Sequence, residues 1–476
     1  MLHIVWFRQD LRLADNPALT HAATSGAIIP LYVLDETPPP HGRPLGSASR
    51  WWLHHSLAAL SSSLGGLVLL RGDPRQLVPD FARQIRADSV TWNRCYEPHA
   101  IPRDTHIKST LTGLGIEARS FNSSLLWEPW EIATGSGGPF KVYSAFWRAC
   151  QKRAPRSRQP QPSALSLTPC TPGDRLSGWH LLPKTPNWAS AFETTWQPGE
   201  AGAQSRLETF LADGLDGYAD LRNRPDLDNV SRLAPHIHFG EISPSQIHAA
   251  ALLHVERHPG TRKDIEKFLS EIGWREFAHH LLFHFPSLPV ENWKSAFDAY
   301  PWATNPAHLS AWQRGLTGYP MVDAGMRELW ATGYMHNRVR MIAASFLVKH
   351  LRIHWREGEA WFWDTLVDAD LANNAASWQW VTGSGADAAP YFRIFNPVTQ
   401  GRNFDPDGAY VRRWCPELAR LPAEHIHAPF AAPAAALRAA GIALGSTYPL
   451  PIVDHAQARA DALAGYDAVK TTNART

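Results

Sequence analysis

Carboxylates, amides and indoles are concentrated in one short stretch of this chain, residues 368–380 (DADLANNAASWQW). A second stretch with few charges, residues 387–396, follows it closely. A solvated helix would carry charges around its surface, and an ordinary amphipathic helix would show a clear apolar stripe. Neither pattern is present, so the sequence indicates the wall of a deep cofactor pocket.

Two other segments place reactive groups at helical spacing. Glu271, Trp274 and Arg275 occupy positions i, i+3 and i+4, which puts a carboxyl, an aromatic ring and a guanidinium on one helix face. Asn337 and Met341 are four residues apart and offer an amide beside a thioether. Each pattern alone is also typical of an ordinary amphipathic helix, with a Glu–Arg pair in the first and surface charges in the second.

A third segment places Tyr218, Arg222 and Ser231 ahead of an expected helix start. Hydroxyl and guanidinium groups beside free backbone N–H groups can hold phosphate oxygens. A helix that is simply capped by Ser231 would explain the same residues. Both interpretations remain open.

The elements that must position these side chains are of two kinds. Near-continuous apolar runs, expected as strands, occur at residues 3–7, 27–34, 67–70 and 89–92. They alternate with expected helices at 49–64 and 74–87, which predicts an α/β domain with a doubly wound parallel sheet. From about residue 200 the strand pattern is lost. Segments such as 320–330 and 337–348 predict an all-α domain there.

Residues 131–199 are expected to be an interdomain linker between domains at 1–130 and 200–476. Residues 132–173 contain no acidic residue and six basic ones, and then become rich in Pro, Ser and Gln. That composition is typical of linkers, although the basic run could also face phosphates. From Arg153 onward a solvated linker is expected.

Composition excludes several classes of protein. The formal net charge of the 476 residues is +2, so a nucleic-acid surface would need local clusters of Arg and Lys. The cysteines are widely spaced and predict neither a disulfide framework nor a metal cluster; they are Cys95, Cys150, Cys170 and Cys415. A start without a signal peptide and the lack of a long apolar run favour a cytoplasmic, non-membrane protein. The 21 Trp residues exceed ordinary structural use and suggest stacking or redox roles.

Taken together, these patterns resemble the DNA photolyase and cryptochrome family. Residues 5–19 (VWFRQDLRLADNPAL) are similar to that family's opening signature. The three helical segments and residues 368–380 match its flavin-binding domain in order and identity. The resemblance extends from about residue 3 to about residue 450. It is closest to the bacterial class I/III photolyases for cyclobutane pyrimidine dimers.

The resemblance implies a reduced FAD in the helical domain. The cofactor positions of the family are matched by Tyr218, Ser231, Arg232, Leu233, Arg340, Asp368, Asp370 and Asn374. Arg340 matches the Arg that pairs with Asp368 near the isoalloxazine ring. Asn374 matches the Asn that faces flavin N5. Plant cryptochromes tend to have Asp there, so Asn374 favours repair over signalling.

The resemblance also implies a substrate, UV-damaged DNA. The family's pocket for the dimer is matched by Glu271, Trp274, Asn337, Met341 and Trp380, and its DNA-facing positions by Arg222, Arg275, Arg338 and Gln400. Photoexcited reduced FAD would pass an electron to a flipped-out dimer, whose charge Glu271 would stabilise. The family's chain of indoles that reduces oxidised flavin is matched by Trp302, Trp355 and Trp378. A signalling cryptochrome and a (6-4) photolyase are the alternatives.

Residues 93–104 align with the family's antenna region. His99 and Ala100 stand where folate-binding photolyases commonly have Asn and Glu. A second chromophore of folate or deazaflavin type is expected, with its identity open. A monomer is expected, and the absence of His/Cys ligand clusters in the sequence predicts independence from added metal.

Overall fold

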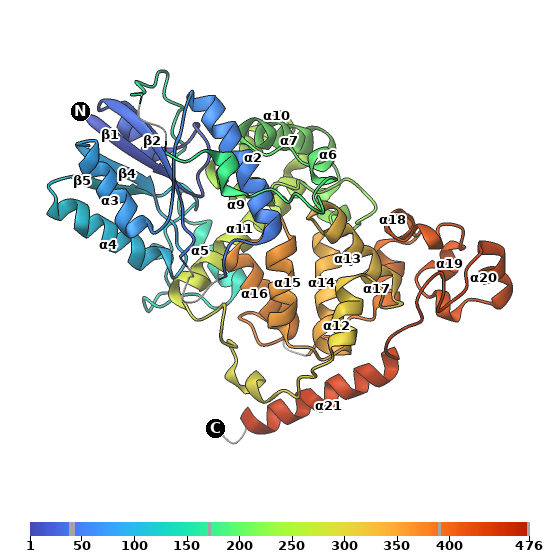
Figure 1. Ribbon diagram of the computed structural model, residues 1–476. Coiled ribbons are helices and arrows are strands. Elements are labelled where there is room, and N and C mark those ends of the chain that lie inside the picture. The colour runs from blue at the N-terminus through green and yellow to red at the C-terminus, as the bar shows by residue number, and fades with distance from the viewer. Residues whose placement is uncertain (38–42, 170–172, 389–391, 474–476) are drawn as a thin grey trace. The chain divides into compact units, whose positions relative to one another are not determined.

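The computed structural model describes residues 1–37, 43–169, 173–388 and 392–473 (Figure 1). Cys170 and residues 389–391 of the weakly charged stretch lie outside these described residues. The chain packs as two compact units. Unit 1 comprises residues 1–216, 230–290 and 367–373, and unit 2 comprises residues 217–229, 291–366 and 374 onward.

Unit 1 contains a five-stranded parallel sheet with the strand order β3-β2-β1-β4-β5. Its strands are β1 (Leu2–Phe7), β2 (Ala27–Leu34), β3 (Val68–Arg71), β4 (Ser89–Asn93) and β5 (Glu117–Phe121). The α/β prediction is confirmed, and the first four strands were predicted. The fifth was missed because β5 (EARSF) lies at a sheet edge, where its charged side chains stay accessible.

Helices cover both faces of this sheet. They are α1 (Pro17–Ala23), α2 (Ser47–Leu64), α3 (Pro74–Gln84) and α4 (Ala100–Gly113). From β1 the chain moves outward through β2 to β3 and then returns to β4 on the other side of β1. Right-handed crossovers therefore place the first two helices on one face and the last two on the other. Figure 1 shows α3 and α4 next to each other beside the sheet.

Charged residues of the opening signature hold unit 1 together. The buried Arg12 guanidinium donates to the carbonyl oxygens of Asp15 at 2.7 Å and Gly240 at 2.8 Å. Asp15, which is fully buried, pairs with Arg156 at 2.5 Å. The expectation of a solvated chain from Arg153 onward is therefore wrong for Arg156, because the buried Asp15 carboxylate needs a cation.

Other parts of the expected linker are folded as well. Helix α5 (Tyr143–Cys150) packs against α11 (Arg262–His284). Farther along, Ile28 of β2 donates its N–H to the carbonyl of Ser166 at 2.7 Å and accepts from the N–H of Thr168 at 2.9 Å. The further helices of unit 1 are α6 (Phe192–Thr195), α7 (Glu200–Thr209), α9 (Ala234–His238) and α10 (Pro244–Arg257).

Unit 2 is helical, as predicted. Its helices are α8 (Tyr218–Leu221), α12 (Pro306–Gln313), α13 (Pro320–Thr332), α14 (Asn337–Ser345), α15 (Trp355–Thr365), α17 (Pro397–Phe404), α18 (Ala409–Trp414), α19 (Ala423–Ile426), α20 (Ala434–Ala440) and α21 (His455–Asn473). The expected helix at 337–348 is α14 followed by the π-helical turn η5 (Phe346–His350). Helix α16 (Leu371–Thr382) begins in unit 1 and continues in unit 2.

None of the helices in the described parts of the chain is long and apolar enough to cross a membrane. In the same parts, no three His, Cys, Asp or Glu side chains are grouped so as to hold a metal ion.

Candidate functional site

Asp370 in unit 1 both caps a helix and faces two histidines. Its Oδ1 accepts from the backbone N–H of Asn373 at 2.8 Å and from the Asn373 side chain at 2.7 Å, which caps α16. Its Oδ2 lies 3.4 Å from His279 Nε2 and 3.7 Å from His238 Nδ1. Burial raises the pKa of Asp370, but the two imidazoles, His279 foremost, outweigh burial and hold it well below its usual range.

The expected phosphate-side residues of unit 1 lie just before α9. Leu233 is the N-cap residue, and Ser231 does not cap the helix with its side chain. The Ser231 hydroxyl instead accepts from the N–H of Leu233 at 3.4 Å. Arg232 has a φ of 51°, a left-handed conformation that side chains other than Gly, Asn and Asp rarely adopt. Ser231 therefore does not cap α9 with its side chain, and the chain bends at Arg232 just before this helix.

On α11 the expected Glu–Arg pair does not form. Glu271 pairs with Lys267, one turn earlier, at 2.7 Å. Arg275 donates to the carbonyl oxygen of Ser124 at 2.8 Å and lies 3.3 Å from Glu276. The i,i+4 spacing was compatible with this pair, but Glu271 pairs with the other cation at i,i+4 spacing on its own helix, and Arg275 takes a partner from elsewhere in unit 1.

Trp274 presents an aromatic surface to solvent. Its side chain is 36% exposed. The opposite face stacks on Tyr143 of α5, with ring centroids 3.7 Å apart and planes 11° from parallel. Tyr143 was not a predicted site residue, because it lies in the segment expected as a linker.

Helix α14 in unit 2 presents the predicted amide and thioether. Asn337 is exposed and Met341 is half-buried, one turn apart on the helix. Arg340 donates from Nε to the carbonyl oxygen of Met335 at 2.7 Å and lies over the Tyr334 ring at 5.3 Å. Its expected partner Asp368 belongs to unit 1, and Arg340 belongs to unit 2.

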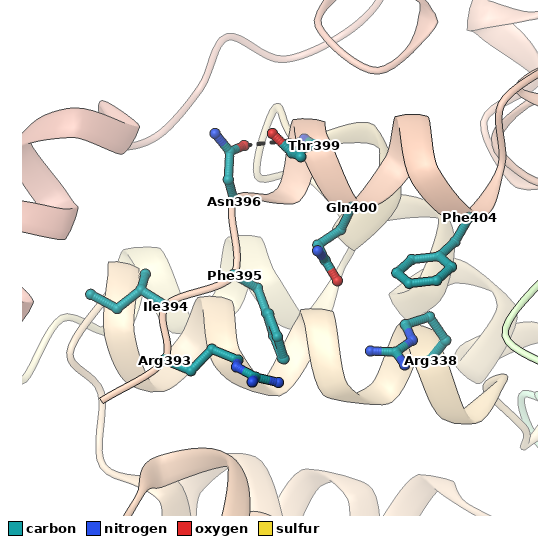
Figure 2. Close-up of a pocket in the computed structure, with 8 residues that line it drawn as sticks. All are labelled: Arg338, Arg393, Ile394, Phe395, Asn396, Thr399, Gln400 and Phe404. Atoms are coloured by element: carbon teal, nitrogen blue, oxygen red, sulfur yellow. Dashed lines mark hydrogen bonds between the residues drawn. The ribbon is translucent and has the colours of Figure 1, made fainter. Parts of the chain in front are cut away.

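A cationic pocket of about 530 Å³ lies between α14 and α17 in unit 2. It is lined by Arg338, Arg393, Ile394, Phe395, Asn396, Thr399, Gln400 and Phe404. Figure 2 shows Gln400 and Phe404 pointing from α17 toward Arg338. The Oε1 atom of Gln400 has no hydrogen-bond partner among the described residues. Arg393 was not a predicted site residue.

The guanidinium of Arg338 is held at the edge of this pocket. It donates to Asn223 Oδ1 at 3.0 Å and lies over the Phe404 ring at 4.4 Å. Burial, followed by the nearness of Arg222 and Arg393, lowers the pKa of Arg338. The three arginines therefore form a local positive cluster on a chain that is nearly neutral as a whole.

Asn374 is buried on α16 and is oriented by Glu359 of α15. Its Nδ2 donates to Glu359 Oε1 at 2.9 Å and to the Glu359 carbonyl oxygen at 3.2 Å. Both amide hydrogens are therefore engaged on one side. Two residues after Trp378, Trp380 is half-buried and donates from Nε1 to the carbonyl oxygen of Asp387 at 3.1 Å.

The three predicted indoles of the electron-transfer chain lie in unit 2, two of them buried and one half-buried. Trp378 and Trp355 are buried, and Trp302 is half-buried. Trp378 packs against α15 at Gly358, where a Cβ atom would come within 2.1 Å of the Trp378 ring. His354 lies between the other two indoles, with ring centroids 5.6 Å from Trp355 and 4.7 Å from Trp302. Burial and Arg356 lower the pKa of His354 to about 4, so this ring is neutral near pH 7.

In the expected antenna region, residues 93–104, most polar side chains already have protein partners. Arg8 pairs with Asp104 at 2.6 Å, and Tyr96 donates to Glu128 at 2.7 Å. Ala100, at the start of α4, is buried. The small side chain at that position therefore offers no polar contact for a folate.

Comparisons with known proteins agree on one family. A family model described as DNA photolyase matches residues 3–165, and a model of the FAD binding domain of DNA photolyase matches residues 268–468. A deoxyribodipyrimidine photo-lyase of Agrobacterium fabrum is 52% identical over 98% of both chains. Cryptochrome-1 of Arabidopsis thaliana is 41% identical over 96% of this chain and 69% of its own length. The crystal structure of a class III photolyase from Agrobacterium tumefaciens superposes with a TM-score of 0.95, at 51% identity over 98% of both chains.

Proposed function

Because the chain belongs to the DNA photolyase and cryptochrome family, we propose that it repairs cyclobutane pyrimidine dimers in DNA with light. The observation that carries this proposal is the partly exposed indole of Trp274 on the same helix as the half-buried Glu271. An apolar plate beside a carboxyl suits a lesion with apolar ring faces and polar base edges. The photo-lyase relative from Agrobacterium supports the same substrate class.

Five residues are proposed to contact the dimer. In unit 1, Trp274 would stack on the dimer, and Glu271 would hydrogen-bond its bases and stabilise the charge it gains. In unit 2, we assign contacts with the dimer to the amide of Asn337, the thioether of Met341 and the indole of Trp380. A dimer is already strained and poorly stacked, so flipping it out of a duplex costs little.

The polar groups around Asp370 fit the sugar part of FAD. His238 Nδ1 and both ring nitrogens of His279 are buried and have no hydrogen-bond partner among the described residues. Hydroxyl groups of a ribose or ribityl chain can donate to Asp370 and also satisfy these nitrogens. When bound in reduced form, FAD supplies under blue light the electron that opens the cyclobutane ring.

Other residues would hold the remaining parts of the cofactor. Residues 231–233 would meet its phosphates from unit 1, and Tyr218 would do so from unit 2. Asp368 and Arg340 would lie at the isoalloxazine side. The amide hydrogens of Asn374 are engaged by Glu359, so its carbonyl oxygen is available to accept from the flavin N5–H.

The arginine cluster of unit 2 would bind the DNA backbone. Arg222, Arg338 and Arg393 lie near one another, and Gln400 offers a polar side chain in the same pocket. Contacts to phosphates fix the position of a protein on DNA without reading sequence. Arg275 has strong protein partners in unit 1, so we assign it mainly to the orientation of the lesion-binding helix.

Electrons for reducing oxidised flavin would travel along the three indoles of unit 2. Trp302 would receive them at the surface, and Trp355 and Trp378 would pass them inward. A neutral His354 between Trp302 and Trp355 avoids the repulsion that an imidazolium would exert on an oxidised indole.

We further propose that residues 1–130 form an antenna domain, residues 131–199 a connecting segment and residues 200–476 the cofactor- and lesion-binding domain. A deazaflavin, or a folate held without the usual Asn-Glu pair, would be the second chromophore. The absorption spectrum of the purified protein, after removal of FAD, distinguishes the two.

Light signalling is the second candidate function, because the Arabidopsis relative is a cryptochrome. The residue that distinguishes a repair enzyme from a signalling protein is Asn374, where plant cryptochromes tend to have Asp. The Asn favours repair.

The test uses the purified protein with reduced FAD and an oligonucleotide that carries one thymine cyclobutane dimer. Loss of the dimer in blue light and its retention in darkness are expected. If the dimer persists in light while the protein holds photoreducible FAD, the repair proposal is wrong. An oligonucleotide with a (6-4) lesion then tests that alternative.

A further inference from the structure

The partly exposed indole of Trp274 packs on aromatic rings of α5 in unit 1. Tyr143 lies against it in near-parallel contact, with a centroid distance of 3.7 Å. The ring of Trp147, one turn later on α5, has its centroid 6.4 Å from that of Tyr143 and is also 11° from parallel to it. The rings of Trp274 and Trp147 are thus each nearly parallel to that of Tyr143, and Trp274 is the exposed member of the three.

Tyr143 is held at its hydroxyl by Ser270. Its hydroxyl donates to the carbonyl oxygen of Ser270 at 2.6 Å and lies 2.9 Å from the Ser270 hydroxyl, one turn before Trp274 on α11. Burial raises the pKa of Tyr143, so the hydroxyl remains a donor. The ring is 9% exposed, against 36% for Trp274.

The close approach of α5 to α11 depends on Gly273. A Cβ atom at this position would lie 2.6 Å from the Trp147 ring and 2.9 Å from the Tyr143 hydroxyl oxygen. The α11 sequence therefore has its smallest residue next to Trp274, where the aromatic stack needs space.

We propose that Tyr143 is a positioning residue for lesion recognition, holding Trp274 as a rigid plate for the apolar face of the dimer. This inference rests on the function proposed above, in which Trp274 contacts the lesion. A free indole samples several rotamers, and ordering it on binding costs affinity. A ring already stacked on Tyr143 avoids much of that cost, and stacked aromatic pairs add stability beyond their buried area.

The experiment measures dissociation constants in darkness for two duplexes that differ only by one thymine dimer. The FAD-loaded protein is compared with the variants Tyr143→Leu, Tyr143→Phe, Trp274→Leu and Phe140→Leu. Phe140→Leu is the matched control, because the Phe140 ring contacts His280 on the same helix α11 and has no ring contact with Trp274. Thermal unfolding and FAD content are recorded for each protein.

Tyr143→Leu is expected to weaken binding of the dimer duplex by roughly three- to ten-fold, as the loss of an aromatic stacking partner implies. Binding of the undamaged duplex and repair by the saturated complex should stay unchanged. Tyr143→Phe keeps the ring and should restore most of the affinity. Phe140→Leu should bind both duplexes like the parent protein.

Two results overturn the inference. In the first, Tyr143→Leu binds the dimer duplex normally while Trp274→Leu does not, which would show that Trp274 does not need Tyr143 to position its indole. In the second, Tyr143→Leu loses affinity for both duplexes together with FAD and thermal stability, so the role of Tyr143 is structural only. If Trp274→Leu itself has no effect on dimer binding, the proposed lesion site is wrong, which is a distinct failure.

Discussion

Asn374 and Glu359 are joined by two hydrogen bonds, from the Asn374 amide to the carboxylate at 2.9 Å and to the backbone carbonyl at 3.2 Å. This relationship decides which atom of Asn374 faces the rest of the site. Because the amide nitrogen is occupied, the side chain acts there as an acceptor and has no proton to give.

Replacing Asn374 by Asp should reverse that behaviour. Two carboxyl groups would then share one small buried space, and such pairs retain a proton because both cannot ionise together. The Asn374→Asp variant is expected to protonate the one-electron-reduced flavin and to accumulate the neutral semiquinone in light. Its long-wavelength absorption is the measurement. A double variant with Glu359→Gln should lose the effect in part, and an unchanged spectrum in the single variant would contradict the assignment of Asn374 to flavin N5.

Trp378→Phe should block photoreduction of oxidised flavin, because phenylalanine is far harder to oxidise than an indole. The measurement is the loss of oxidised-flavin absorbance under blue light with an external reductant. Trp312→Phe is the control, because Trp312 is buried like Trp378 and their ring centroids are 6.3 Å apart. Trp312 lies outside the proposed electron-transfer route. Photoreduction at the normal rate in Trp378→Phe would remove the indole from the route.

Arg338→Gln should weaken binding of damaged and undamaged DNA alike. A phosphate contact contributes through counterion release, so removing one should reduce the slope of log K against log salt by about 1. The measurement is the dissociation constant at several salt concentrations. Arg438→Gln on the outlying helix α20 (Figure 1) removes the same charge from an exposed site and should leave the slope unchanged. A selective loss for damaged DNA in Arg338→Gln would show that Arg338 reads the lesion.

Lys349 should make stability depend on pH. Its ammonium donates to the Arg393 carbonyl oxygen at 2.5 Å inside η5, where burial and then Arg393 lower its pKa from 10.5 to about 7. Between these values the unfolded chain binds a proton that the folded chain lacks, so the free energy of unfolding rises with pH.

Lys349 contributes at most about 1.4 kcal/mol per pH unit to this rise in the free energy of unfolding. Lys349→Met should remove this rise, as measured by urea unfolding from pH 7 to pH 10 against an exposed-site control, Lys152→Met. Parallel pH profiles for the parent protein and Lys349→Met would show that the lysine keeps its ordinary pKa.

Several features of this protein were already determined by local sequence. The apolar runs of β1, β2 and β4 are buried on both faces and could be recognised without the fold. The face shared by Asn337 and Met341 follows from helical periodicity alone. The family also followed from the order of short motifs, because each motif is contiguous in the chain.

Other features depended on tertiary structure. Asp15 forms an ion pair with Arg156, which lies 141 residues later in the chain. This contact holds a segment that was expected to be solvated within unit 1. Tyr143 could be recognised as a support for Trp274 only after α5 was seen to pack on α11. Glu359 is 15 residues from Asn374, on a different helix, so no helical spacing links them.

The physical reason for this difference is the range of the interactions. Periodicity, caps and strand burial are set by neighbours within a few residues, and the sequence displays them directly. The partner of a buried charge or ring is chosen by which elements pack together. Helical spacing allowed Glu271 to pair with Lys267 or with Arg275. Arg275 instead donates to Ser124, 151 residues away, so the tertiary structure decided what Arg275 does.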